Sequence, residues 1–201
     1  KNFRGKCVPI TRIEGEENNN QALFQIRELL GGQEFAALSN AVSEVVMNVF
    51  HHSQSNICYV CAQTYSRDDS IVITIADGGI GYKKQLKNTY PYINDDETAL
   101  KVAMSKKMTG NLDKNRNNSG MGLYLTAETM LKNRGELCIH SGYAMYEQIQ
   151  DDKQYKKSEV DWKGVLVSLK YYINNPVSMK DVNDAWDFKD DDYNEFLDLF
   201  C

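Results

Sequence analysis

One amphipathic helix, predicted over residues 34–52, constrains this 201-residue chain more than any other stretch. Its apolar positions recur at three- and four-residue steps, the spacing of a helix with one buried face (Leu38, Val42, Val45, Val46 and Val49). Glu44 and Asn48 are four residues apart and are followed by His51 and His52, so these polar groups share a second stripe. That stripe fits either a solvated surface or the wall of a ligand pocket.

Two glycine motifs follow the helix in the sequence. Residues 71–82 are an apolar run that ends in the pattern Asp-x-Gly-x-Gly (Asp77, Gly79 and Gly81). Residues 119–126 place a Gly-x-Gly-Leu pattern at the start of another predicted helix (Gly120, Gly122 and Leu123). Glycines let the main chain pass close to a ligand, and the free N–H groups at a helix N-terminus attract phosphate oxygens.

The helix and the two glycine motifs, in this order, resemble the Bergerat-fold ATPases of the GHKL superfamily. These motifs are most similar to those in the ATP-binding domains of histidine kinases and anti-sigma-factor kinases. The resemblance covers about residues 35–170. It implies an α/β (α+β) two-layer sandwich with a mixed, mostly antiparallel sheet, helices on one face and a long ATP lid at about residues 82–119.

The resemblance also implies roles for individual residues. Asp77 would accept a hydrogen bond from the adenine amino group, and Asn48 would be the protein's ligand to Mg²⁺. Glu44 would orient or deprotonate an attacking water or hydroxyl, while the histidines are left out of catalysis. The other residues expected at ATP are Gly79, Gly81, Gly120, Met121, Gly122 and Leu123. Candidate phosphate contacts in the lid, among which the sequence does not choose, are Lys106, Lys107, Lys114 and Arg116.

One position departs from the family pattern. The family commonly has Gly-Thr at the start of its last strand, with the threonine near adenine, whereas this chain has Gly164 and Val165. The hydroxyl is therefore absent unless Ser168 or Thr126 replaces it.

Local patterns predict the remaining elements. An edge strand at 7–10 and a helix at 22–30 precede the long helix, and two β-rich runs at 57–65 and 70–76 indicate an antiparallel hairpin. The lid has room for a helix at 97–107. The expected elements after it are a helix at 121–132 and strands at 136–141, 143–148 and 164–172, with the polar residues 150–159 as a long connection.

The charge of the chain separates a domain from a tail. The net charge is −5, and residues 176–201 contain eight acidic residues against two lysines, so the rest is close to neutral. We expect one ATPase domain at 1–175 and an acidic tail at 176–201. Large apolar residues at near-helical spacing in the tail indicate that it docks, either on this domain or on a partner.

Composition indicates a soluble cytoplasmic protein. The chain has 42% apolar residues, no apolar run near the roughly 20 residues of a membrane span, and no clustered basic face of the kind that binds nucleic acid. It begins without a methionine, as expected of a processed or trimmed piece. Its five cysteines have no framework spacing and are expected to be reduced; Cys58 and Cys61 lie in a predicted strand and point to opposite faces.

These observations predict an Mg-ATP-binding, histidine-kinase-like domain that phosphorylates or regulates a separate partner protein in signalling. Self-phosphorylation on histidine is not expected, because all three histidines lie inside the ATPase region. The alternatives are a non-catalytic module that uses ATP to stabilise a partner surface, and an interaction domain that has lost the nucleotide. Whether ATP is hydrolysed, transferred or only bound stays open.

Overall fold

A single antiparallel sheet organises the fold. The structure is a computed structural model that describes residues 6–32, 35–105 and 122–184. Five strands follow the order β1-β2-β3-β5-β4, and every pairing among the described residues is antiparallel, so the expectation of a mixed sheet is wrong. The strands are β1 (Cys7–Glu14), β2 (Ile57–Tyr65), β3 (Ser70–Asp77), β4 (Glu136–Ile149) and β5 (Asp152–Tyr172).

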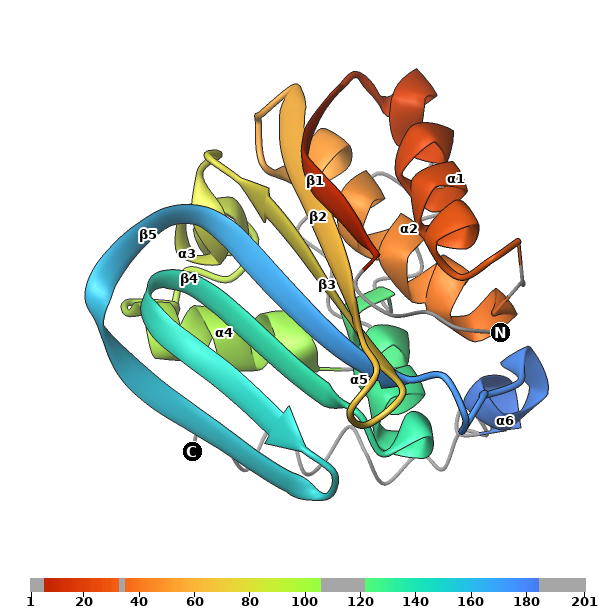
Figure 1. Ribbon diagram of the computed structural model, residues 1–201. Helices are drawn as coiled ribbons and strands as arrows, with labels where there is room; N and C mark the ends of the chain where they lie inside the picture. Colours follow the sequence, from red (N-terminus) through yellow and green to blue (C-terminus); the bar gives the residue numbers. More distant parts are fainter. Residues whose placement is uncertain (1–5, 33–34, 106–121, 185–201) are drawn as a thin grey trace.

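Helices cover one face of this sheet, as expected (Figure 1). Side chains such as Ile71, Ile73, Leu169 and Tyr171 point from alternate strand positions into the layer between sheet and helices and are fully buried there. The helices are α1 (Asn19–Leu29), α2 (Ala36–His52), α3 (Gly81–Lys87), α4 (Asp96–Met104), α5 (Gly122–Asn133) and α6 (Met179–Asp184), with a 3₁₀ helix η1 (Glu16–Asn18) before α1. The protein is thus an α+β sheet packed against helices.

The last part of the sheet differs from the prediction. Two long strands, β4 and β5, replace the three short strands, and the polar residues 150–159 form a tight turn and the first half of β5 instead of a connection. Gln150 adopts a φ of 54° in that turn. The first half of β5 is polar because most of its side chains remain exposed, so it lacks the alternation by which a half-buried strand is recognised.

The predicted lid is in part a folded element. Residues 81–104 contain α3 and α4, whose apolar side chains are buried (Tyr82, Leu86, Ala99, Leu100 and Val102). This half of the segment therefore belongs to the packed domain. The other half of the lid lies outside the described residues.

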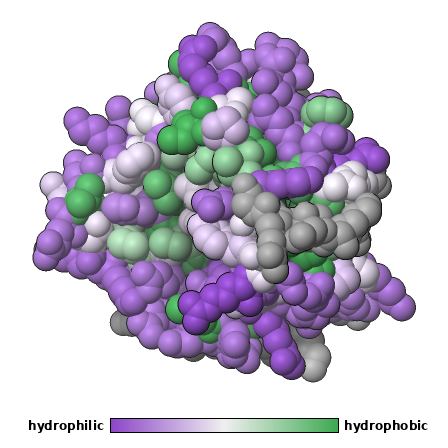
Figure 2. Space-filling view, in the orientation of Figure 1, coloured by the Kyte–Doolittle hydropathy of each residue, from purple (hydrophilic) through white to green (hydrophobic). Residues whose placement is uncertain are grey.

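The face of the sheet opposite the helices is half-buried and mostly uncharged in its centre. Cys61, Thr74, Ser168 and Cys138 form a row across β2, β3, β5 and β4 on this side. Thr74 and Ser168 share a hydrogen bond of 3.2 Å. Figure 2 shows hydrophobic and hydrophilic residues mixed on the face in view.

Candidate functional site

Helix α2 carries the first predicted site residues. Glu44 and Asn48 are both half-buried and lie one turn apart, about 6 Å along the axis. Ser53 is the C-cap residue that follows the helix, and its hydroxyl donates to the Val49 carbonyl at 2.6 Å. Glu44 and Ser53 are separated by nine residues, or about 14 Å of helix.

Asp77 lies at the end of β3, where the prediction placed it. Its side chain is 3% exposed. One carboxylate oxygen, Oδ1, accepts the Gly79 N–H at 2.6 Å, and the other, Oδ2, accepts the Val165 N–H at 3.3 Å. The carboxylate therefore ties the glycine turn after β3 to the neighbouring strand β5.

The same turn is fastened to the end of α2. The Ile80 N–H donates to the Ser53 carbonyl at 2.9 Å. A Cβ on Gly79 would overlap that carbonyl, so the turn can approach the helix only with glycine at this position. This contact brings the Asp-x-Gly-x-Gly motif to the helix that carries Glu44 and Asn48.

Gly81 serves a second close approach. Its φ is 70°, a left-handed value that glycine adopts without strain, and a Cβ there would be 2.9 Å from the Ser141 hydroxyl. The Ser141 Oγ accepts the Tyr82 N–H at 3.2 Å and donates to the Gly164 carbonyl at 3.0 Å. The room beside Gly79 and Gly81 is thus filled by Ser53 and Ser141 of the protein itself.

Burial raises the pKa of the Asp77 carboxyl, although its two backbone N–H partners act in the opposite direction. Cys58 is the partner of Asp77 in the β2–β3 register. Burial and, second, the nearby Asp77 raise the pKa of the Cys58 thiol to about 11. This end of the sheet is therefore a poorly solvated place in which a donor to the carboxylate would be strongly preferred.

Glu44 lies against the start of α5. A Cβ on Gly122 would overlap the Glu44 carboxylate, so the glycine makes room for that side chain. Burial raises the pKa of Glu44, and the nearby His51 opposes the shift. The structure thus brings two of the predicted site residues, Glu44 and Gly122, into contact.

The remaining predicted residues divide into two groups. Leu123 is 7% exposed and packs in the hydrophobic core. His51 pairs with Glu16 at 3.1 Å and makes an edge contact with the His52 ring. The predicted contacts Gly120, Met121, Lys106, Lys107, Lys114 and Arg116 lie outside the described residues.

The two proposed substitutes for the missing hydroxyl take part in other hydrogen bonds. Ser168 pairs with Thr74 on the opposite face of the sheet, and the Thr126 hydroxyl donates to the Gly122 carbonyl. Gly164 and Val165 do lie at Asp77: a Cβ on Gly164 would overlap the Asp77 carbonyl. The departure from the family pattern is therefore located at the site.

Sequence reasoning missed three residues around Asp77. Ser141 holds the glycine turn, Cys58 flanks the carboxylate, and the Trp162 indole donates to the Asp77 carbonyl at 3.2 Å. Ser141 and Trp162 come from β4 and β5, far along the chain, and no local pattern marks them.

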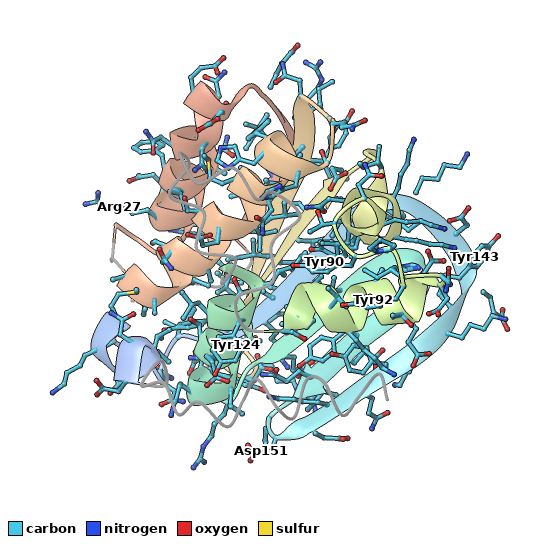
Figure 3. The ribbon with its side chains drawn as sticks, turned by 180° about the vertical axis from the view of Figure 1, so that it is seen from behind. Arg27, Tyr90, Tyr92, Tyr124, Tyr143 and Asp151 are labelled. Carbon is cyan, nitrogen blue, oxygen red and sulfur yellow. The ribbon has the colours of Figure 1, made fainter. Side chains whose placement is uncertain are left out.

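Figure 3 shows a further aromatic group on the helix side, where Tyr90 and Tyr92 lie beside α4. Their ring centroids are 6.0 Å apart.

The residues that the structure describes contain no group of three or more His, Cys, Asp or Glu side chains that could hold a metal ion. None of the helices within 6–32, 35–105 and 122–184 is long and apolar enough to cross a membrane.

Comparison of the chain with models of known protein families gives no match, and comparison with curated protein sequences gives none either.

Proposed function

We propose that this chain is a Bergerat-type, histidine-kinase-like domain that binds Mg-ATP and phosphorylates or regulates a separate protein in cytoplasmic signalling. One observation carries the proposal. A buried carboxylate, Asp77, sits at the end of a strand whose glycine turn is bonded to the C-terminus of α2, the helix that carries Asn48 and Glu44. The residues proposed to bind the adenine base, to hold Mg²⁺ and to accept a proton are Asp77, Asn48 and Glu44. They thus lie on a strand and a helix that are hydrogen-bonded to each other through the glycine turn.

The donor types fit the parts of Mg-ATP. Asp77 has acceptor positions in a poorly solvated site, as the adenine amino group requires. Asn48 on α2 offers an amide oxygen, a ligand type that Mg²⁺ prefers. The start of α5 at Gly122 offers main-chain N–H groups to phosphate. Mg²⁺ held there would neutralise phosphate charge.

Glu44 distinguishes an enzyme from a binding module. Its carboxyl is half-buried, and the resulting rise of its pKa brings it nearer to the working range of a general base. Such a group would accept a proton from water or from a hydroxyl of the partner. Binding alone needs no such group at this position, which favours the enzyme over the alternative of a non-catalytic module.

Thermal unfolding with and without Mg-ATP tests the binding. A ligand at 100 times its Kd stabilises a protein by about 2.7 kcal/mol, which raises Tm by roughly 5–10 °C for a domain of this size. We expect this shift in the wild type and its loss in Asp77→Ala. Asp95→Ala is the matched control, because Asp95 also accepts a backbone N–H, at the start of α4, and should keep the shift.

The two readings of Glu44 are separated by turnover. We expect Glu44→Gln to retain the Mg-ATP shift and to lose phosphate release or transfer. Unchanged turnover in Glu44→Gln would leave only the binding module, and no thermal shift at millimolar Mg-ATP in the wild type would end the proposed function altogether.

A further inference from the structure

Four side chains, one from each of four strands, form a row at the place proposed for the nucleobase. Cys58 pairs with Asp77 in the β2–β3 register, and Ser141 pairs with Val165 in the β4–β5 register. The Val165 N–H donates to Asp77 Oδ2 and joins the two pairs. All four side chains lie on the helix side of the sheet, with Asp77 between a thiol and an aliphatic group.

Asp77 itself presents acceptors. An ionised carboxylate has about four acceptor positions and no donor. Of the donors in the described part of the chain, Gly79 and Val165 use one position on each oxygen, which leaves one position on each for a ligand. A ligand edge with two adjacent donors is the best match for such a pair of oxygens.

The neighbours of Asp77 in this row add no free donor of comparable strength. Val165 has a purely aliphatic side chain, and the Cys58 thiol is a weak donor. The Ser141 hydroxyl donates its one proton to the Gly164 carbonyl and accepts the Tyr82 N–H, so it is already paired in both directions.

Adenine and guanine make different demands on this row. The Watson–Crick edge of adenine places an amino donor beside the N1 acceptor, whereas guanine places two donors, N1–H and the 2-amino group, side by side. A site that rejects guanine needs a donor next to its carboxylate, since discrimination comes from polar groups left unpaired by the wrong ligand. Val165, which lies on the same face of the sheet in the neighbouring strand, has no such donor in its side chain.

We propose that Val165 sets the nucleobase specificity of this site, which reads donor groups and accepts guanine as well as adenine nucleotides. The inference rests on the proposed function, because it concerns the base end of the same site. The chemical class of the ligand is a purine nucleoside triphosphate with an amino group on its Watson–Crick edge.

Direct binding to the full chain tests the inference. Isothermal titration with ATP, GTP and N6,N6-dimethyl-ATP, each with Mg²⁺, gives three Kd values. We expect GTP to bind at least as tightly as ATP, because guanine adds one hydrogen bond to the ionised Asp77 carboxylate. The dimethyl analogue, which has lost its amino donors, should bind more weakly than either.

Substitutions locate the specificity. Val165→Thr restores a hydroxyl beside Asp77 and should shift the ratio of Kd values by about threefold to tenfold in favour of ATP. Val72→Thr, the same change on the opposite face of the sheet, is the control and should leave the ratio unchanged. Tyr82→Phe removes a buried phenol near Asp77 and should also leave it unchanged.

The outcomes separate this inference from the proposed function. Preference for ATP over GTP by more than about tenfold would overturn the inference and leave the function standing. If Tyr82→Phe removed such a preference, the Tyr82 phenol would be the base-reading donor in place of a group at 165. Binding of neither triphosphate would overturn both.

Discussion

The Glu44 carboxylate occupies the space into which a side chain on Gly122 would project. Glu44 comes from the middle of α2 and Gly122 from the first residue of α5, so the contact joins the glutamate–asparagine helix to the second glycine motif. Gly122 is the first residue of α5, where a helical backbone does not itself call for glycine. Glycine at 122 therefore makes room for the end of the Glu44 side chain, which would have to shift if a methyl group were added.

This relationship predicts a coupling between the two positions. Alanine is favoured over glycine in a helix, but at 122 its methyl group meets Glu44. We expect Gly122→Ala to stabilise the Glu44→Ala background more than the wild type, by about 0.5–1.5 kcal/mol. Urea unfolding of the two single variants and the double variant measures this coupling. Additive effects within about 0.3 kcal/mol would mean that Glu44 does not pack against α5.

Asp77 predicts an unusual dependence of stability on pH. Burial raises its pKa in the folded chain, so the folded state binds the proton more readily than the unfolded state. The contribution of Asp77 to the free energy of unfolding therefore falls as pH rises from the unfolded pKa, about 3.9, through the raised folded value.

The difference between wild type and Asp77→Asn isolates this contribution. Urea unfolding of both proteins between pH 4 and pH 7 should show the wild type gaining stability relative to the variant as the pH is lowered. Subtraction removes the similar contribution of Glu44, whose pKa burial also raises. A difference that is constant, or that grows toward pH 7, would show that the carboxylate is better stabilised than its burial implies.

The contribution of Asp95 to stability should depend on pH in the opposite direction to that of Asp77. It is the N-cap of α4, where its carboxylate accepts the Thr98 N–H at 2.7 Å, and this hydrogen bond lowers its pKa. Its contribution to stability is present above the unfolded pKa and is lost as pH falls through the lowered folded value. We expect Asp95→Ala to reduce the free energy of unfolding at pH 7 by about 1 kcal/mol, measured in urea. Asp95→Asn, which can still cap the helix, should lose much less.

Short-range patterns predicted the elements but not their long-range partners. The helix α2 and the β2–β3 hairpin follow from local periodicity and turn residues, and the structure confirms them. The β4–β5 ribbon was misread because the exposed first half of β5 is as polar as a loop. Burial on one face produces a readable alternation, and a largely exposed strand lacks it.

The site shows the same division. The position of Asp77 at the end of β3 was predictable, because an apolar run ends there in a glycine turn. Its partners Val165 and Trp162 are 88 and 85 residues away, and only the register of β3 on β5 places them at the carboxylate. Strand order depends on the packing of the whole sheet, and the residues near Asp77 in the sequence do not determine it.

The C-terminal end of β5 bonds to the side chain of Asn133, which is completely buried. Its amide donates to the carbonyls of Tyr172 at 2.9 Å and Asn175 at 2.6 Å, and its side-chain carbonyl accepts the Tyr172 N–H at 2.7 Å. The Asn175 amide donates in return to the Asn133 main-chain carbonyl at 2.7 Å. These hydrogen bonds form a clamp around Asn133 that joins the end of α5 to the segment after β5.

Removing this clamp should lower stability without touching the base site. Asn133→Ala removes the side-chain partner of the Tyr172 N–H and of the Asn175 carbonyl, whereas the Tyr172 carbonyl keeps the Asn175 N–H at 3.2 Å. A buried unpaired group costs about 1–3 kcal/mol, so we expect a loss of roughly 2–4 kcal/mol in urea unfolding. Asn174→Ala, next to the clamp but exposed and with its amide donating to Asp69, is the matched control and should lose less than about 1 kcal/mol. Because Asn133 bonds to Tyr172, seven residues or about 23 Å along β5 from Val165, nucleotide Kd in the folded Asn133→Ala protein should equal that of the wild type. A small loss of stability would mean that water replaces the amide at this position.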